Sequence, residues 1–201
     1  MKTEFEILLI FISYLIGSIP FGYIYTKRFV GINILHHGSG NTGSTNVRRF
    51  AGPKVALFTQ LCDMLKGLLP VASVIFIEYK RIYTFDDIFI YAVGLATILG
   101  HNFSIFLKLK GGKGVNTTLG ASLLLSPYSV FASVLVYFLV KWCSGYVSLG
   151  SICLAITLTL TGWIINNTSY LFYYFLICSA FIIIMHIPNL KRLMNGTENK
   201  S

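Results

Sequence analysis

The sequence predicts an all-α protein that crosses a membrane several times, and three observations support this fold class. The 201-residue chain is 55% hydrophobic and 15% aromatic, with a mean hydropathy of +0.71. Only 11% of its residues are charged, whereas a soluble domain carries about 25%. The apolar residues also fall into runs long enough to cross a bilayer, which takes about 20 residues of helix.

These apolar runs define the predicted helices in chain order. Five clear runs cover about residues 6–25, 55–77, 88–107, 147–164 and 170–187. A further run, residues 115–140, contains Pro127, which removes a backbone donor and clashes with the preceding helical turn. This run forms either one long helix or two short ones, so the chain has six spans or seven.

The distribution of basic residues favours seven. They gather in five groups: Lys27 with Arg28, residues 48–54, residues 108–113, Lys141, and Lys191 with Arg192. The positive-inside rule places these groups in the cytoplasm, and the segments 78–81, 84–87 and 165–169 outside. Six spans would put the basic C-terminal tail outside. We therefore expect seven transmembrane helices, an N-terminus outside, a cytoplasmic C-terminus, and two short helices meeting near Pro127.

This topology places the polar, glycine-rich stretches on one face of the membrane. We expect a single polytopic domain over residues 1–201, with cytoplasmic active-site loops at about 27–54, 108–114, 141–147 and 188–201. Loops that only connect helices need not share a chemistry. Four polar loops on one face therefore predict a functional site there.

The first polar stretch, GSGNTGSTNVRR at residues 38–49, favours binding of an anion. Its glycines allow the backbone to approach a ligand closely, and successive N–H groups in such a turn form a concave anion site. Arg49 adds a guanidinium that binds phosphate through two parallel hydrogen bonds. The stretch is neither a Walker A motif nor a GxGxxG motif. The alternative is a flexible polar connector.

The second stretch, KLKGGKG at residues 108–114, has a similar chemistry. Lys110 and Lys113 flank Gly111 and Gly112. A helix starting near Gly114 would add the positive potential of its N-terminus. The alternative is a cluster of positive charge that only fixes the orientation of the neighbouring span.

Histidines lie at the edges of the predicted spans. His186 and Asn189 are three residues apart and share a helical face if the helix continues through Pro188. A histidine at this depth is a general base, a phosphate ligand or a polar anchor, and the same alternatives hold for His101. The adjacent His36 and His37 are assigned no role.

Acidic residues and cysteines are sparse. Asp63 lies inside a predicted span with Lys66 one turn later, and we expect a structural ion pair because charges within a membrane usually pair. The sequence has no cluster of His, Asp and Glu near the cytoplasmic loops, so no metal is expected. The four cysteines occur singly, which predicts neither a zinc site nor a disulfide. The scattered basic residues do not favour nucleic acid as a partner.

Taken together, the motifs resemble a known family. They are GSIPFGYIYTK (17–27), GSGNTGSTNVRR (38–49), DMLKG (63–67), GHNFSIFLKLKGGKGV (100–115), YVSLGS (146–151) and HIPNLKRLMNGTE (186–198). Their order and spread along the chain resemble the bacterial acyl-phosphate:glycerol-3-phosphate acyltransferase family, PlsY.

This resemblance implies a multi-pass enzyme of the bacterial cytoplasmic (plasma) membrane. The enzyme would transfer a fatty acyl group from acyl phosphate to the 1-hydroxyl of glycerol 3-phosphate, giving lysophosphatidic acid for phospholipid biosynthesis. Its partners would be these two substrates and the lipid bilayer. No cofactor is implied, and we expect a monomer.

The resemblance also implies roles for individual residues. The candidate catalytic residues are Ser148, His186 and Asn189. The candidate phosphate-binding residues are Gly38, Ser39, Gly40, Asn41, Asn46, Arg49, Gly111, Gly112 and Lys113. The chain departs from the family at Leu35 and Gly145, where many members carry arginine.

Two questions stay open at this point. The proton of the glycerol hydroxyl is taken either by His186 or by an oxygen of a substrate phosphate. The alternative function is a small transporter of phosphate or a sugar phosphate. Transporters often contain internal repeats and broken helices at mid-membrane, whereas this sequence shows no repeat and gathers its polar residues at one face.

Overall fold

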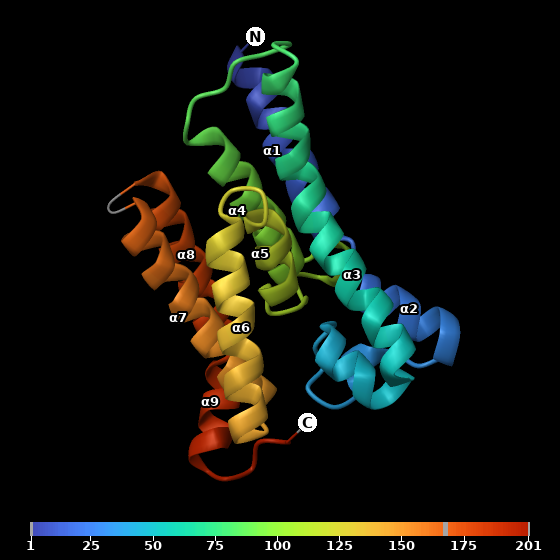
Figure 1. The fold of residues 1–201 in the computed structure, drawn as a ribbon. Helices are drawn as coiled ribbons and strands as arrows, with labels where there is room; N and C mark the ends of the chain where they lie inside the picture. The colour runs from blue at the N-terminus through green and yellow to red at the C-terminus, as the bar shows by residue number, and fades with distance from the viewer. Residues whose placement is uncertain (1, 167–168, 201) are drawn as a thin grey trace. The chain divides into compact units, whose positions relative to one another are not determined.

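The computed structural model describes residues 2–166 and 169–200, and this part of the chain is helical without any strand. Figure 1 shows the helices in chain order. They are α1 (Lys2–Ser18), α2 (Phe21–Val30), η1 (Ile34–His36), α3 (Ser44–Tyr79), α4 (Phe89–Asn102), η2 (Ile105–Leu107), α5 (Val115–Ser122), α6 (Pro127–Ser144), α7 (Val147–Asn166), α8 (Tyr170–Met185) and α9 (Ile187–Met194). The predicted all-α fold class is confirmed.

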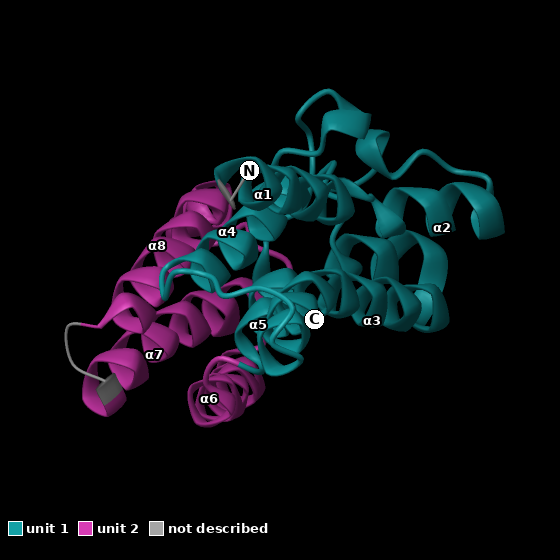
Figure 2. Ribbon diagram, turned by 90° about the horizontal axis from the view of Figure 1, so that it is seen from above, with its two compact units in different colours: residues 1–124 teal, residues 125–201 magenta. Residues whose placement is uncertain are grey.

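The helices form two compact units, residues 1–124 and residues 125–201 (Figure 2). In the first unit, α1 packs against α4, and α3 packs against both α2 and α5. In the second unit, α7 packs against α6 and α8, and α9 contacts α7 and α8. The grouping of all residues into one domain stays a prediction.

The first predicted helix is interrupted. The chain leaves α1 at Ser18 and starts α2 at Phe21, because Pro20 cannot donate a backbone hydrogen bond. The last carbonyls of a helix need partners from elsewhere. Here Ser104 Oγ donates to the carbonyl of Ser18 at 2.6 Å, and Lys66 Nζ donates to the carbonyl of Ile19 at 2.8 Å. Distant helices therefore stabilise this break.

Helix α3 starts earlier than predicted. It begins at Ser44 rather than near residue 55, and it bends at Gly52, whose φ of 82° and ψ of 172° are not helical. Gly52 and Pro53 therefore separate a short N-terminal segment, residues 44–51, from the long apolar segment. This short segment carries Asn46 and Arg49 into the first polar loop.

The run at residues 115–140 forms two helices, with a break just before Pro127. Helix α5 has 8 residues, which rise about 12 Å and cannot cross a hydrocarbon core of about 30 Å. Helix α6 has 18 residues and is long and apolar enough to span. Two helices therefore meet near Pro127 as expected, and α6 continues beyond the predicted run to Ser144.

By length and composition, five helical segments among the described residues are candidate membrane spans. The number rises to six if α8 and α9, bent by 53°, are one span. The count of seven and the orientation of the termini stay predictions. The predicted outer segment 165–169 includes residues 167 and 168, which lie outside the described residues. Large apolar side chains exposed on α6, such as Phe131, Leu135 and Phe138, suit contact with lipid.

Candidate functional site

The first loop, residues 37–43, connects η1 to α3 and is organised by Asn46. Asn46 is buried, and its Nδ2 donates to the carbonyls of His37 and Asn41, each at 3.0 Å. Its Oδ1 accepts from the backbone N–H of Ser39 at 3.3 Å. A single side chain from the start of α3 thus contacts three positions of the loop.

Gly38 is required for this arrangement. Its φ is +58°, a conformation that side chains with a Cβ rarely adopt. A Cβ at this position would collide with Asn46 Oδ1 and would lie 2.6 Å from an edge atom of the Phe50 ring. Asn41 completes the turn, because its Oδ1 accepts from the N–H of Gly43 at 2.8 Å.

His37, which the sequence left without a role, supports the same loop. Its Nδ1 lies 2.9 Å from the carbonyl of Asn33, and its ring packs edge-on against Phe50 with centroids 5.4 Å apart. Only the fold brings Asn33 and Phe50 to either side of His37. No spacing in the sequence indicates this contact.

Ser39 and Arg49, the predicted phosphate-binding pair, are both exposed. Both are connected to Asn46: the backbone N–H of Ser39 donates to its Oδ1, and Arg49 follows about one turn further along α3. Their side chains are therefore attached to an ordered frame and are accessible to a ligand. Gly40 lies between them in the turn with a φ of +65°.

The second loop, residues 108–114, meets the first within the same unit. Asn116, in the first turn of α5, donates from Nδ2 to Ser44 Oγ at 3.3 Å, and Ser44 opens α3. Lys113 is half-buried and Gly112 is buried. The N-termini of α3 and α5, which both carry positive potential, are thus joined by a hydrogen bond between their first turns.

A charged cluster is buried near the second loop. Asp63 Oδ1 lies 2.8 Å from Lys66 Nζ, and both side chains are 3% exposed. The predicted ion pair is therefore confirmed. His101 joins it, with Nδ1 3.5 Å from Asp63 Oδ1, a contact that the sequence did not indicate.

In the second unit, His186 lies where α8 ends and α9 begins. The helix does not continue straight through Pro188 but bends by 53°, and the N–H of Asn189 donates to the carbonyl of His186 at 2.9 Å. His186 Nδ1 lies 2.8 Å from the carbonyl of Ile182. Because a carbonyl only accepts, Nδ1 carries the proton, and Nε2 is the basic nitrogen of the neutral ring.

Glu198, in the C-terminal tail, contacts the candidate residues of this unit, and the sequence did not assign it a role. Its carboxylate accepts from Asn189 Nδ2 at 2.6 Å and from Arg192 Nε at 2.7 Å. Burial alone would raise the pKa of Glu198, but these hydrogen bonds, the nearby Ser148 hydroxyl and the charge of Arg192 together lower it. Ser148 itself is buried at the start of α7.

The tail also brings a cation to Gly145, one of the two departures from the family pattern. A Cβ at Gly145 would lie 3.5 Å from the Lys200 side chain, and Lys200 Nζ lies 5.7 Å from the centre of the Tyr146 ring. The other departure, Leu35, is half-buried in η1, and nothing in the structure explains it.

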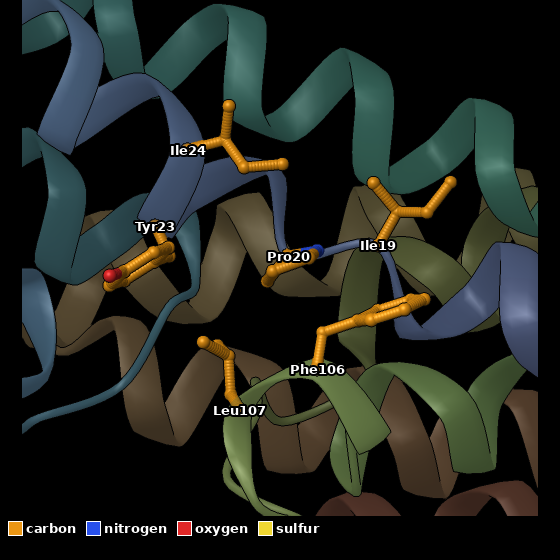
Figure 3. A pocket seen from close by; sticks show the side chains of 6 residues that line it. All are labelled: Ile19, Pro20, Tyr23, Ile24, Phe106 and Leu107. Carbon is orange, nitrogen blue, oxygen red and sulfur yellow. The ribbon is translucent and has the colours of Figure 1, made fainter.

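An apolar pocket of about 380 Å³ lies beside the break between α1 and α2 (Figure 3). Its lining combines this break with η2, the short helix that leads into the second loop. The lining residues are Ile19, Pro20, Tyr23, Ile24, Phe106 and Leu107.

Comparisons with known proteins agree with this geometry. The sequence profile of the family described as glycerol-3-phosphate acyltransferase matches residues 7–196. A glycerol-3-phosphate acyltransferase of Clostridium acetobutylicum is 39% identical over 193 residues, which cover 96% of this chain and 98% of the relative. Another, of Geotalea daltonii, is 42% identical over 196 residues, or 96% of each chain.

Solved structures give the same result. The crystal structure of PlsY, an integral membrane glycerol 3-phosphate acyltransferase, in its glycerol 3-phosphate form matches with a TM-score of 0.89 at 34% identity, over 98% of this chain and 95% of that one. The lysophosphatidic acid form matches with a TM-score of 0.86 at 34% identity, over 97% and 94%. These matches confirm an all-α integral membrane protein and do not support the transporter alternative. The chain therefore belongs to the glycerol-3-phosphate acyltransferase family.

Proposed function

We propose that the protein transfers a fatty acyl group from acyl phosphate to the 1-hydroxyl of glycerol 3-phosphate in the bacterial plasma membrane. The observation that carries the proposal is the hydrogen bond between Asn116 and Ser44, which joins the starts of α5 and α3. Two anion-binding loops thereby lie together, and the proposed reaction has two phosphorylated substrates. The relatives are named glycerol-3-phosphate acyltransferases, after the acceptor in this reaction. The two related crystal structures are the glycerol 3-phosphate form and the lysophosphatidic acid form of PlsY.

The chemistry needs no cofactor, because acyl phosphate is a mixed anhydride. The glycerol oxygen attacks the acyl carbonyl carbon, and an ester bond forms as the bond from that carbon to the phosphate oxygen breaks. Inorganic phosphate leaves with the bonding electrons, and the hydroxyl proton passes to a base. The protein has to align the reacting groups and stabilise the negative charge on the carbonyl oxygen and the departing phosphate.

The two loops of the first unit supply this stabilisation. The side chains of Ser39 and Arg49 bind one phosphate, in a frame fixed by Asn46. Lys113 binds the other, on a turn that Gly111 and Gly112 shape. Ser39 acts as an anion ligand rather than as a nucleophile, since no Ser-His-Asp arrangement is readable in the sequence.

The second unit supplies the candidate catalytic residues. Nε2 of His186 is oriented by the bond from Nδ1 to Ile182, which suits a base or a hydrogen-bond acceptor. An oxygen of a substrate phosphate is the competing base, because phosphate titrates near pH 6. Asn189 and Ser148 are polar residues of the same unit that orient the substrate.

The acyl chain lies in apolar surroundings, where its burial is favourable. The pocket between the α1–α2 break and η2 is lined almost entirely by apolar atoms. Helix η2 directly precedes the second loop in the chain. The pocket provides an apolar place for methylene groups of the acyl chain.

Turnover in detergent micelles tests the function. We expect purified protein to convert palmitoyl phosphate and radiolabelled glycerol 3-phosphate into labelled lysophosphatidic acid, with little product when a palmitoyl thioester is the donor. A preference for the thioester would show that the acyl donor is wrong. Retained turnover in His186→Ala would assign the base role to substrate phosphate, and loss of turnover with unchanged substrate affinity would assign it to His186.

A further inference from the structure

The His101 side chain lies directly against the second loop. His101 ends α4 and is 5% exposed, and its backbone carbonyl accepts from the N–H of Gly112 at 3.0 Å. A Cβ on Gly112 would collide with the Nε2 edge of the His101 ring, and one on Gly111 would collide with the His101 carbonyl. The backbone of the loop therefore rests on this residue with no space for a side chain between them.

The opposite edge of the ring faces the buried ion pair. His101 Nδ1 lies 3.5 Å from Asp63 Oδ1 and makes no hydrogen bond within the described part of the chain. Asp63 is held by Lys66 at 2.8 Å, and Lys66 is held in turn by the carbonyl of Ile19. The contacts run from the α1–α2 break through α3 and α4 to the second loop, all within the first unit.

An ion pair that only stabilises the helices accounts for part of this arrangement. Lys66 satisfies the end of α1, and Asp63 neutralises Lys66, so these two residues need no histidine. A buried polar ring is costly in an apolar span, and such residues usually have a function. The placement of His101, with one nitrogen toward the carboxylate and the other toward Gly112, requires a further explanation.

We propose that His101, supported by Asp63, is a positioning residue that holds the backbone of the second loop in its phosphate-binding shape. The ring acts through Gly111 and Gly112 and does not touch the substrate. Asp63 Oδ1 faces Nδ1 of the ring, and the same oxygen is held in place by Lys66. The identity of the phosphate compound rests on the proposed function, whereas the effect on the loop does not.

Steady-state kinetics of purified His101→Ala test the proposal, with Thr97→Val as the matched control. Thr97 is also buried in α4, and among the described residues its hydroxyl bonds only to the carbonyl of Val93 in the same helix. We expect His101→Ala to raise KM for one of the two phosphorylated substrates about tenfold while kcat changes less than about threefold. His101→Gln, whose amide nitrogen reaches the place of Nε2, should recover part of the loss, and Thr97→Val should behave as wild type.

Hydrogen exchange of the folded protein in detergent provides a readout that needs no substrate. His101→Ala should speed exchange across residues 108–114 several-fold and leave residues 37–43 unchanged, because local opening follows the loss of local contacts. Asp63→Asn should speed exchange in the same segment. At residues 108–114, adding Asp63→Asn to His101→Ala should have little further effect, because Asp63 acts on this loop through His101.

The proposal is overturned if His101→Ala lowers kcat with KM unchanged, or if exchange at residues 108–114 stays at the wild-type rate. It is also overturned if Thr97→Val produces the same changes. A wild-type protein without acyltransferase activity would contradict the proposed function instead, and the exchange experiment would still test the role of His101.

Discussion

Replacing Asn46 with alanine is expected to disorganise the first loop while leaving the helices folded. Asn46 makes two hydrogen bonds to loop carbonyls and accepts one from the N–H of Ser39. The two carbonyls, of His37 and Asn41, belong to half-buried residues and can gain water when the amide is removed. The change therefore acts mainly on the shape of the loop.

The expected size follows from these contacts. A net contribution of about 1 kcal/mol per hydrogen bond gives roughly 3 kcal/mol for the three. The carbonyl of His37 keeps a second partner, the N–H of Gly40 at 3.0 Å. We therefore expect the substitution to cost the ordered loop about 2–3 kcal/mol of free energy. Because about 1.4 kcal/mol corresponds to a factor of ten, we expect kcat/KM to fall roughly 30- to 100-fold.

The assay measures lysophosphatidic acid formation at varied concentrations of each substrate, alongside the melting temperature in detergent. Asn46→Asp should not restore activity, because it keeps the acceptor for Ser39 but loses both donors. Thr59→Val is the control, since Thr59 is buried further along α3 and, within the part of the chain that the structure describes, its hydroxyl bonds only to the carbonyl of Val55. Wild-type kcat/KM in folded Asn46→Ala would refute the role given to this side chain.

Three further predictions follow from the same structure. Arg49→Ala should lower kcat/KM at least about tenfold through loss of a charged phosphate ligand, whereas Arg28→Ala, an exposed cation on α2, should keep activity; equal losses in both would point to surface charge. The lowered pKa of Glu198 means that its ionised form stabilises the fold above the unfolded-state pKa of about 4.3 and that this stabilisation is lost as pH falls through the folded pKa. The melting temperature of Glu198→Gln should therefore lie below wild type at pH 7, and the gap should close as the pH falls below about 4; a constant gap would contradict this. Single cysteines at Ser39 and Thr197, both exposed, should resist impermeant thiol reagents in intact cells, and labelling from outside would invert the predicted topology.

The sequence predicted the helical fold well, because hydropathy directly records which segments enter the bilayer. It was less accurate at helix ends. Pro20 interrupts a helix where hydropathy stays high, since this break depends on a missing backbone donor and on partners such as Lys66 and Ser104. Helix α3 starts in the polar stretch before residue 55, which hydropathy does not mark as helical, and it bends at Gly52. The break at Pro127 was expected, but the full length of α6 was not, because residues 141–144 continue the helix into the segment predicted as a loop.

For the site, the sequence indicated the loops but not what holds them. The glycines and basic residues carry a local signal, and the resemblance named Asn46 among the phosphate-binding residues. His37 and Glu198 were given no role, and the contact of His101 with Asp63 was not indicated, because each acts through contacts made only after folding. The three-residue spacing of His186 and Asn189 was recognised, whereas the bend at Pro188 was left open, since proline both starts and breaks helices.

The central claim is direct acyl transfer between two phosphorylated substrates bound at the glycine-rich loops. Its most direct test measures lysophosphatidic acid and inorganic phosphate together, using purified protein, palmitoyl phosphate and glycerol 3-phosphate. We predict that both products appear at equal rates, that the acyl group is on the 1-position, and that Lys113→Ala slows both products in parallel. Phosphate release without lysophosphatidic acid, or no product from a folded sample, would contradict the claim.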